Sequence, residues 1–292
     1  MKKTTPQTLA QRPELPQGFS RESLKTVAVI AILVLAFTNF SEVINFLVNI
    51  LIFIYTYVNE SFGIAIILLT ILIRLVTWPL NAQQMKGAKA MQDLQTDKDW
   101  LAMQKKYAKD REKLAQEQMR LYREKGINPF GSCLPTLIQF PILFALIPAI
   151  TYAIGSTPLS ILKLSNSLYS FQDVAALVPL NSKFLWMDLG LPEKTIIPGL
   201  EWAIPVLALT VALTTYVQTK LTMPAAANPN DQSAATTKMM SIYMPIMLYF
   251  FSVNYASGLS VYFVASNILS IVQYAFMGKV NWRNLLPGGQ KS

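Results

Sequence analysis

One arginine lies in the middle of an otherwise apolar stretch of the chain. The stretch 65–80 reads AIILLTILIRLVTWPL, and Arg74 is its one charged residue. Thr70, Arg74, Thr77 and Asn81 are spaced i, i+4, i+7 and i+11, so in a helix they form one polar row. Arginine stays protonated in proteins, so Arg74 must be hydrated, reach lipid headgroups or meet an anion. The pattern predicts electrostatic attraction of a polar or acidic group.

Two interpretations of Arg74 compete. It lies seven residues before Asn81, about 10 Å at helical rise, so its side chain could nearly reach the headgroups. Against this, its own face is polar, and the long apolar segments contain no Asp or Glu apart from Glu201 at one end. We therefore favour a functional role for Arg74.

Other apolar segments carry similar polar rows. These rows are Thr136 with Gln139; Thr210, Thr214 and Gln218; and Tyr262, Ser266, Ser270 and Gln273. A single Ser or Thr in such a helix often bonds to its own backbone or supports packing. Because the rows recur in several segments, we expect them to line a wet cavity together.

Composition excludes most catalytic chemistry. The chain of 292 residues has no histidine and one cysteine, Cys133. It therefore has no Ser-His-Asp arrangement, no cysteine-rich metal site and no internal disulfide. The sequence contains no phosphate-binding glycine motif. We expect no enzymatic activity, no cofactor and no metal.

The distribution of apolar residues predicts an all-α, polytopic membrane protein. Hydrophobic residues make up 52% of the chain and charged residues 14%, against about a quarter charged in soluble domains. The expected spans are an anchor helix at 24–40 and core helices at about 62–80, 134–154, 202–221, 239–255 and 259–276. An uncleaved anchor is favoured over a signal peptide because no small-residue cleavage site follows it.

The remaining segments are assigned by length and charge. Residues 1–43 form a basic segment with the anchor, and residues 44–60 form an interfacial amphipathic helix, because Ile44–Val58 is short for a span. Residues 61–278 form the core, and residues 279–292 form a short basic tail.

Basic residues predict the orientation. The loop 81–133 holds eleven Lys and Arg, whereas 156–200 holds three. Positively charged loops stay in the cytoplasm, so six spans place both termini in the cytoplasm. A seventh span at Ile44–Val58 would move the 81–133 loop outside, against this rule.

The basic loop itself is predicted to be a helical hairpin at 82–125. Its helices are expected at Ala82–Tyr107 and Arg111–Lys125, with a turn near Ala-Lys-Asp. The hairpin is either a solvated charged element or a docking surface for ribosomal RNA, anionic lipid or a targeting factor. The candidate contact residues are Lys105, Lys106, Arg111, Arg120 and Arg123.

Several sequence blocks together resemble a known family. ILIRLVTWPL, LYREKGINPFGSCLPTLIQFPILFAL, FLWMDLGLPE and KMMSIYMPIMLYFFSVNYASGLSVYFVASNILSIVQY occur in order around the hairpin. They are similar to blocks of the YidC/Oxa/Alb family of membrane protein insertases, over roughly residues 44–278. The resemblance implies a five-helix core with a cytoplasmic hairpin. It also implies a hydrophilic groove open to cytoplasm and lipid but closed on the outside.

The resemblance also implies how such a protein works. The arginine matched by Arg74 meets acidic or polar residues of an incoming segment, and the aromatic residue matched by Tyr262 contacts it. The hairpin receives the segment, which then leaves along the first and last core helices. The residues expected to line the groove are Thr70, Arg74, Thr77, Gln139, Thr214, Gln218, Tyr262, Ser266 and Gln273.

Partners and departures follow from the same resemblance. The expected partners are nascent membrane proteins, membrane lipids, the ribosome and the Sec translocon, with no DNA. The large external domain of many relatives is not expected here, and the usual Leu-Gln-Pro of the hairpin reads Leu94-Gln95-Thr96. Two other functions stay open, a small-anion transporter or channel and a non-catalytic assembly factor of a larger translocon.

Overall fold

The computed structural model describes residues 38–95, 97–108, 110–127, 134–154, 157–170, 180–196, 203–222 and 232–278. The predicted anchor helix up to residue 37 and the tail 279–292 lie outside the described residues. The chain divides into Met1–Asn39 and Phe40–Ser292. The fold is that of the second unit.

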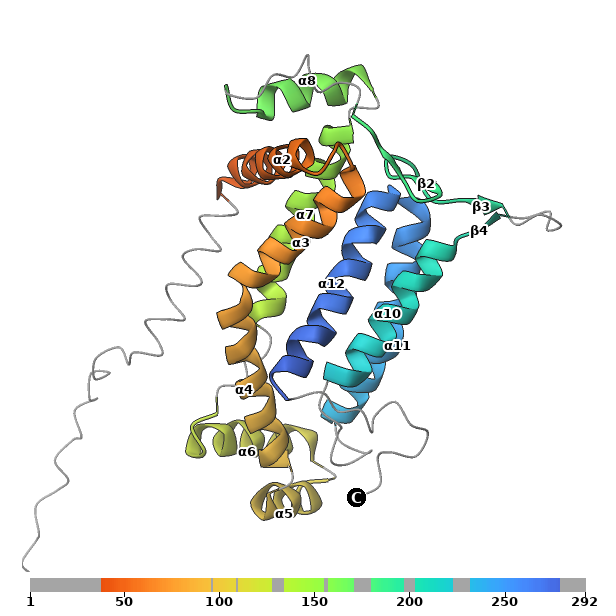
Figure 1. The fold of residues 1–292 in the computed structure, drawn as a ribbon. Helices are drawn as coiled ribbons and strands as arrows, with labels where there is room; N and C mark the ends of the chain where they lie inside the picture. Colours follow the sequence, from red (N-terminus) through yellow and green to blue (C-terminus); the bar gives the residue numbers. More distant parts are fainter. Residues whose placement is uncertain are drawn as a thin grey trace, which may run out of the picture. The chain divides into compact units, whose positions relative to one another are not determined.

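Five long helices run alongside one another and form a bundle (Figure 1). They are α3 (Phe62–Val76), α7 (Leu134–Ile154), α10 (Val206–Thr222), α11 (Gln232–Asn254) and α12 (Ser257–Phe276). Helix α12 contacts each of the other four, so it is the central helix of the bundle. The predicted all-α class is confirmed.

The spans differ in length from the expectation at several ends. Helix α7 has its predicted bounds, whereas α11 begins seven residues earlier than expected, at Gln232. Within the described ranges, length and composition single out α2 (Phe40–Tyr57) and α12 as helices able to cross a membrane. A bent pair, Ile142–Ile154 with Pro158–Ser167, could be a further, broken span.

The first core helix is interrupted, which corrects the predicted continuous span 62–80. Helix α3 ends at Val76, and a new helix, α4 (Trp78–Gln95), begins two residues later. Pro79 explains the break, because proline has no backbone N–H to bond the carbonyl one turn earlier and its ring crowds that carbonyl. Helix α4 then continues directly into the hairpin.

The hairpin differs in the same way from the two helices expected. Its first arm is divided between the end of α4 and a separate helix, α5 (Lys98–Lys106), and its second arm is α6 (Arg111–Glu124). The Asp97 side chain accepts a hydrogen bond from the Asp99 backbone and caps α5, as Asp commonly does at a helix start. The predicted helix Ala82–Tyr107 is therefore wrong, while the turn between Lys106 and Arg111 is confirmed.

The hairpin has a small core of its own. Leu94, Trp100 and Met103 are buried and pack with partly buried residues of α6 and with Ile127. The rings of Trp100 and Tyr122 lie 5.4 Å apart. These contacts join three short helices, so the hairpin is a folded element rather than a charged loop.

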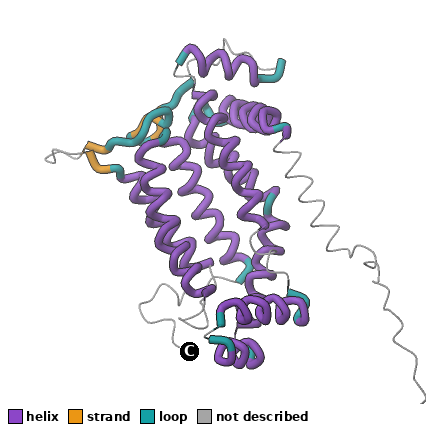
Figure 2. Tube along the Cα trace, turned by 180° about the vertical axis from the view of Figure 1, so that it is seen from behind, coloured by secondary structure: helices purple, strands orange, loops and turns teal. Residues whose placement is uncertain are grey.

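Two helices lie across the end of the bundle that is far from the hairpin (Figures 1 and 2). They are α2 and α8 (Pro158–Ser167). Asn49 of α2 joins them, because its Nδ2 donates to the Ser167 carbonyl at 2.7 Å and its Oδ1 accepts from the Tyr169 N–H at 2.8 Å. Helix α2 also packs on α7, whose Ala145, Ala149 and Ala153 are fully buried and let the helices approach closely.

Two short antiparallel strand pairs lie at the same end (Figure 1). Strand β1 (Lys183–Phe184) pairs with β2 (Met187–Asp188), and β3 (Thr195–Ile196) pairs with β4 (Ala203–Ile204). The sequence does not predict them, because a strand of two residues has no alternation to detect.

Residues 181–193, which we call the clasp segment, contact the ends of five helices. The Asn181 N–H donates to the hydroxyl of Tyr55 in α2 at 2.9 Å. The Phe184 ring occupies the space beside Gly63 in α3, where a Cβ would come within 2.2 Å of it. A Cβ on Gly190 would come within 2.8 Å of the Ile154 side chain at the end of α7.

The same segment binds the first residues of α10 and α12. The Leu191 carbonyl accepts from the Ser257 N–H at 2.9 Å, and the Leu189 carbonyl accepts from the Gly258 N–H at 3.0 Å. The buried carboxylate of Glu193 accepts from the Leu207 N–H at 3.0 Å, near the start of α10. The clasp segment therefore holds this end of the bundle together.

A candidate polar site between helices α3 and α12

Arg74 lies in the last turn of α3, where its charge is favoured by the carbonyl end of the helix. It is half-buried, and its Nη2 donates to both the hydroxyl and the carbonyl of Ser266 in α12, at 2.5 and 3.1 Å. Arg74 makes no ion pair with an acidic side chain among the described residues. The charge is therefore held by one serine.

A second pair lies closer to the hairpin. Asn81 of α4 donates from Nδ2 to Oε1 of Gln273 in α12 at 3.3 Å. Gln273 is only 3% exposed, and its Nε2 has no hydrogen-bond partner among the described atoms. A buried donor left unpaired costs about 1–3 kcal/mol. We call Arg74, Asn81, Ser266 and Gln273 the polar seam.

The structure brings the row that contains Arg74 against the row that contains Ser266 and Gln273. Thr70 and Thr77 belong to the first row, but each donates to a carbonyl of its own helix, at 2.6 Å to Ile66 and 2.8 Å to Ile73. Their hydroxyls are therefore satisfied locally. Tyr262 is 2% exposed, so it lies inside the protein.

The third polar row lies against a different face of α12. Asn267 donates from Nδ2 to the hydroxyls of Thr215 and Thr214 in α10, at 2.8 and 3.2 Å. Gln218 bonds to Thr222 of its own helix at 3.2 Å. The hydrogen bonds of Thr214 and Gln218 among the described residues therefore do not join them to Arg74. The side chain of Gln139 lies outside the described residues.

Sequence reasoning missed Asn267 and Thr215, and did not assign Asn81 to the site. Asn267 is the one asparagine of α12, and such a residue in a membrane helix commonly bonds to a neighbouring helix. That signal was available. Its partner was not, because spacing along one helix does not say which helix it faces.

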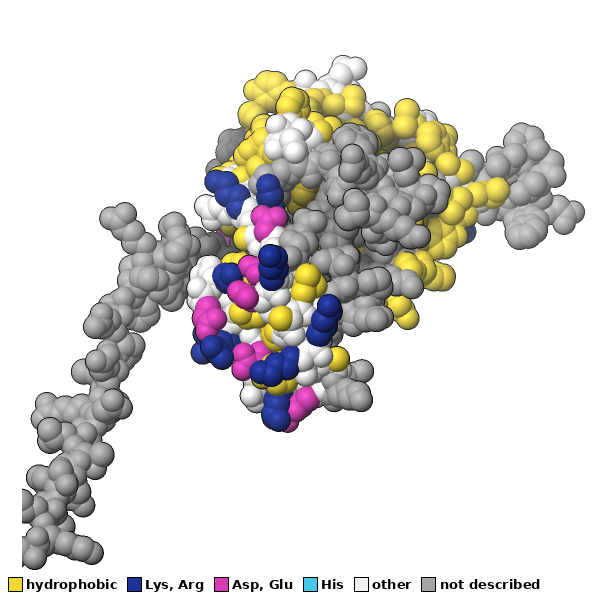
Figure 3. Space-filling view, turned by 90° about the horizontal axis from the view of Figure 1, so that it is seen from below, with side chains coloured by type: hydrophobic (Ala, Val, Ile, Leu, Met, Phe, Trp, Pro, Cys, Tyr) yellow, Lys and Arg dark blue, Asp and Glu magenta, His cyan; other side chains and the backbone are white. Residues whose placement is uncertain are grey.

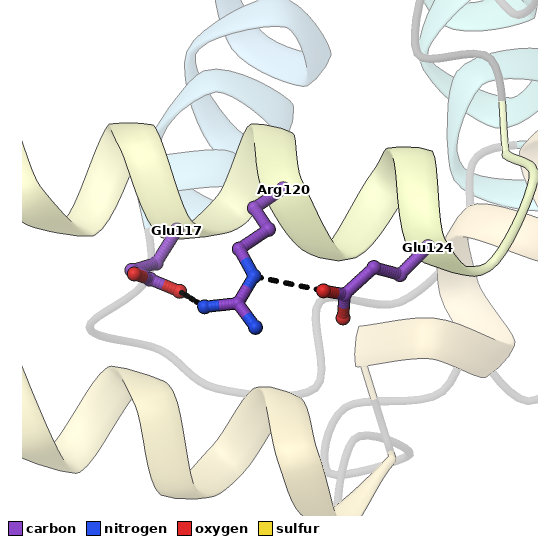
Figure 4. A network of polar contacts seen from close by, with 3 residues as sticks. All are labelled: Glu117, Arg120 and Glu124. Atoms are coloured by element: carbon purple, nitrogen blue, oxygen red, sulfur yellow. Dashed lines mark hydrogen bonds and ion pairs between the residues drawn. The ribbon is translucent and has the colours of Figure 1, made fainter. Parts of the chain in front are cut away.

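The charged residues of the hairpin are largely balanced by acids. Arg120 bonds to Glu124 at 2.8 Å and to Glu117 at 3.5 Å along one face of α6 (Figure 4). Figure 3 views the protein from the hairpin end and shows Lys and Arg side chains interspersed with Asp and Glu there. Lys105, Lys106 and Arg123 are exposed, and the Arg111 side chain lies outside the described residues. The surface is mixed rather than uniformly positive.

One ion pair closes the hairpin. Lys125, which follows α6, donates from Nζ to the carboxylate of Asp97 at 2.8 Å and lies 3.6 Å from Asp99. The bond to Lys125 lowers the pKa of Asp97 below its ordinary value, and the same bond raises the pKa of Lys125. The start of α5 is thereby held to the end of α6.

Comparison with known proteins identifies the family. A family model described as "60Kd inner membrane protein" matches residues 53–283, which include the polar seam and the hairpin. The chain belongs to the YidC/Oxa family. It is thus a membrane protein, and the predicted resemblance is confirmed.

Curated relatives agree with this assignment. The chain is 36% identical over 219 residues to "Membrane protein insertase YidC 2" of Bacillus anthracis, covering 74% of this chain and 71% of the relative. It is 35% identical over 228 residues to "Membrane protein insertase YidC" of Syntrophus aciditrophicus, covering 78% of this chain. The match spans only 34% of that longer relative.

A solved structure shares the fold. The crystal structure of an active YidC insertase with its first transmembrane domain resolved matches 86% of this chain and 52% of that chain. The TM-score is 0.51 and the sequence identity is 24%. The likeness at this identity concerns the arrangement of the helices.

Proposed function

We propose that this chain is a membrane protein insertase and chaperone, which moves hydrophobic segments and short external tails of client proteins from the cytoplasm into the bilayer. The observation that carries the proposal is Arg74, a half-buried cation in an apolar helix with Ser266 as its hydrogen-bond partner across the seam. The similarity to proteins named membrane protein insertases supports it.

The charge is suited to exchange one partner for another. A guanidinium binds a carboxylate through two parallel charge-assisted hydrogen bonds, which are roughly twice as strong as bonds to neutral groups. An acidic residue of a client therefore displaces Ser266 from Arg74. Because the seam lies among apolar helices, the field of Arg74 attracts such a residue more strongly than it would in water.

The seam also defines a route. A client received at the hairpin first meets the amides of Asn81 and Gln273 and then Arg74, about 10 Å further along the helix at 1.5 Å per residue. The seam opens between α3 and α12 to form a groove that faces the cytoplasm and the lipid. Tyr262 is buried while the seam is closed, so it contacts the client only after the seam opens. The apolar segment then leaves along α3 and α12.

The orientation and partners complete the proposal. The hairpin and both termini lie in the cytoplasm of a bacterial cell with this chain in its inner membrane, and the clasp segment lies outside. Exposed Lys105, Lys106 and Arg123 supply contact with the ribosome, and the lipid-facing helices supply contact with a Sec translocon. Nascent membrane proteins are the clients.

Paired clients test the role of the charge. We expect Arg74→Lys to retain much of the insertion of a client with an acidic external tail, Arg74→Ala to lose most of it, and Arg74→Glu to lose more through repulsion. A client whose tail lacks acids should respond much less. Insertion is measured by protease protection in vesicles that hold equal amounts of each variant.

A matched control removes a different cation from a membrane helix. Lys220 of α10 lies 5.7 Å from the centre of the Tyr216 ring, away from the seam. Lys220→Ala should leave the insertion of both clients unchanged. Equal loss for both clients with Arg74→Ala would show that Arg74 is structural. Anion flux through vesicles that depends on Arg74, without insertion, would favour a transporter instead.

A further inference from the structure

The turn between β1 and β2 holds two apolar side chains out from the protein. Leu185 is 75% exposed and Trp186 is 57% exposed. Leu185 has a φ of 55°, in the left-handed region that bulky residues rarely adopt. Such a conformation is strained and persists where surrounding contacts enforce it. The turn therefore holds a strained backbone, and its exposed tip consists of the apolar side chains of Leu185 and Trp186.

The indole of Trp186 is fixed from below. Its Nε1 donates to Oε1 of Glu193 at 3.2 Å, and Oε2 of the same carboxylate accepts from the Leu207 N–H at 3.0 Å. Glu193 is 7% exposed. The polar atom of the indole thus points inward, its apolar ring faces outward, and one buried carboxylate connects the tip to the start of α10.

Exposed apolar side chains occur elsewhere at the same end of the bundle. Helix α2 exposes Phe46, Phe53 and Tyr57, and helix α8 exposes Leu159 and Leu162, each by more than half of its surface. Figure 1 shows α2 and α8 on one side of this end and the strand pairs on the other. The apolar groups therefore surround the end of the bundle rather than form one patch.

The positions of these exposed apolar side chains indicate whether a protein partner or lipid covers them. A protein partner covers a contiguous patch on one side, whereas lipid surrounds a membrane protein at one depth. Trp and Tyr concentrate where lipid headgroups meet water, because their rings are apolar and their polar atoms are bonded. We propose that the Leu185–Trp186 turn is an anchor in the lipid headgroup region at the hairpin-distal end, and that Glu193 transmits its depth to α10.

Fluorescence of the full-length protein in vesicles tests the anchor. A variant keeps Trp186 as its one tryptophan; the residues replaced by Phe are Trp78, Trp100, Trp202 and Trp282. We expect phosphatidylcholine brominated near the glycerol end of its acyl chains to quench Trp186 more than lipid brominated near the methyl end. Aqueous iodide should quench it weakly. A matched variant that keeps only Trp100, which is buried in the hairpin core, should show no quenching by either lipid.

A second probe avoids the tryptophan replacements. A nitroxide on Leu185→Cys, in a Cys133→Ser background, should be accessible to oxygen and poorly accessible to a water-soluble nickel complex. Strong quenching of Trp186 by iodide without quenching by brominated lipid, or high access of the nitroxide to nickel, places the tip in water and overturns the proposal.

Discussion

Replacing Gln273 by an apolar residue should make the protein more stable to unfolding and slow the insertion of clients. The change Gln273→Met keeps the length and flexibility of the side chain and removes both amide atoms. The buried Nε2, which has no partner among the described residues, costs about 1–3 kcal/mol, and the bond from Asn81 at 3.3 Å contributes about 0.5–1.5 kcal/mol. Asn81 is only partly buried, so it can find another partner. The net gain in the free energy of unfolding is about 0.5–1.5 kcal/mol.

Two measurements on the same preparation check this reasoning. Thermal unfolding in detergent should shift upward by about 2–4 °C for each kcal/mol in a chain of comparable size. Insertion of an acidic client should slow, because the seam loses an amide on the client's route. Gln218→Met is the matched control, since the Nε2 of Gln218 is bonded to Thr222 and the same exchange gains nothing there. A lower unfolding temperature for Gln273→Met, or faster insertion, would refute the account of the seam.

Three further predictions concern the elements around the seam. Asn49→Ala leaves the Ser167 carbonyl and the Tyr169 N–H without the Asn49 side chain and should speed hydrogen exchange in α8. The control Asn45→Ala should leave this exchange unchanged. Equal exchange in both variants would exclude the joining role of Asn49. Pro79→Ala restores a backbone N–H and should join α3 to α4, which spin-label distances across the break would report as a straighter helix; unchanged distances would mean another cause. The pKa of Asp97 is lower in the folded protein than its ordinary value of 3.8. The ionised carboxylate therefore stabilises the hairpin at pH values above 3.8, and this stabilisation is lost as the pH falls below that value. The protection factors of the α5 amides, which remove the intrinsic pH dependence of hydrogen exchange, should therefore fall at low pH, and Asp97→Asn should abolish that fall.

The bundle could be predicted because its signals are long. About 20 apolar residues in a row indicate a membrane helix whatever it packs against, and α7 has the bounds expected. The polar rows also indicated which face of each helix is unusual. For this reason the rows were expected to line one cavity together, with Gln139, Thr214 and Gln218 beside Arg74, Ser266 and Gln273.

The features that the sequence did not predict depend on contacts between segments that are far apart in the chain. A row of Thr and Gln on α10 looks the same whether it faces Arg74 or Asn267, and the difference is set by how the helices pack. Pro79 was visible in the sequence, but the apolar run around it favoured a continuous span. The clasp segment has no periodicity, since its contacts are made by backbone atoms, glycines and one buried carboxylate.

The clasp segment has a consequence for the electrical work of insertion. Under the proposed function, helices that are tied together by the clasp segment at one end would separate at the other, so a client in the seam would meet a closed end beyond it. The whole membrane potential then falls across this short barrier. Each elementary charge that crosses it gains or loses about 2.3 kcal/mol per 100 mV. If the proposed function holds, a cell interior that is negative would draw an acidic tail outward at the point where Arg74 releases it, while the closed end would leave ions no continuous water path along which to dissipate that potential.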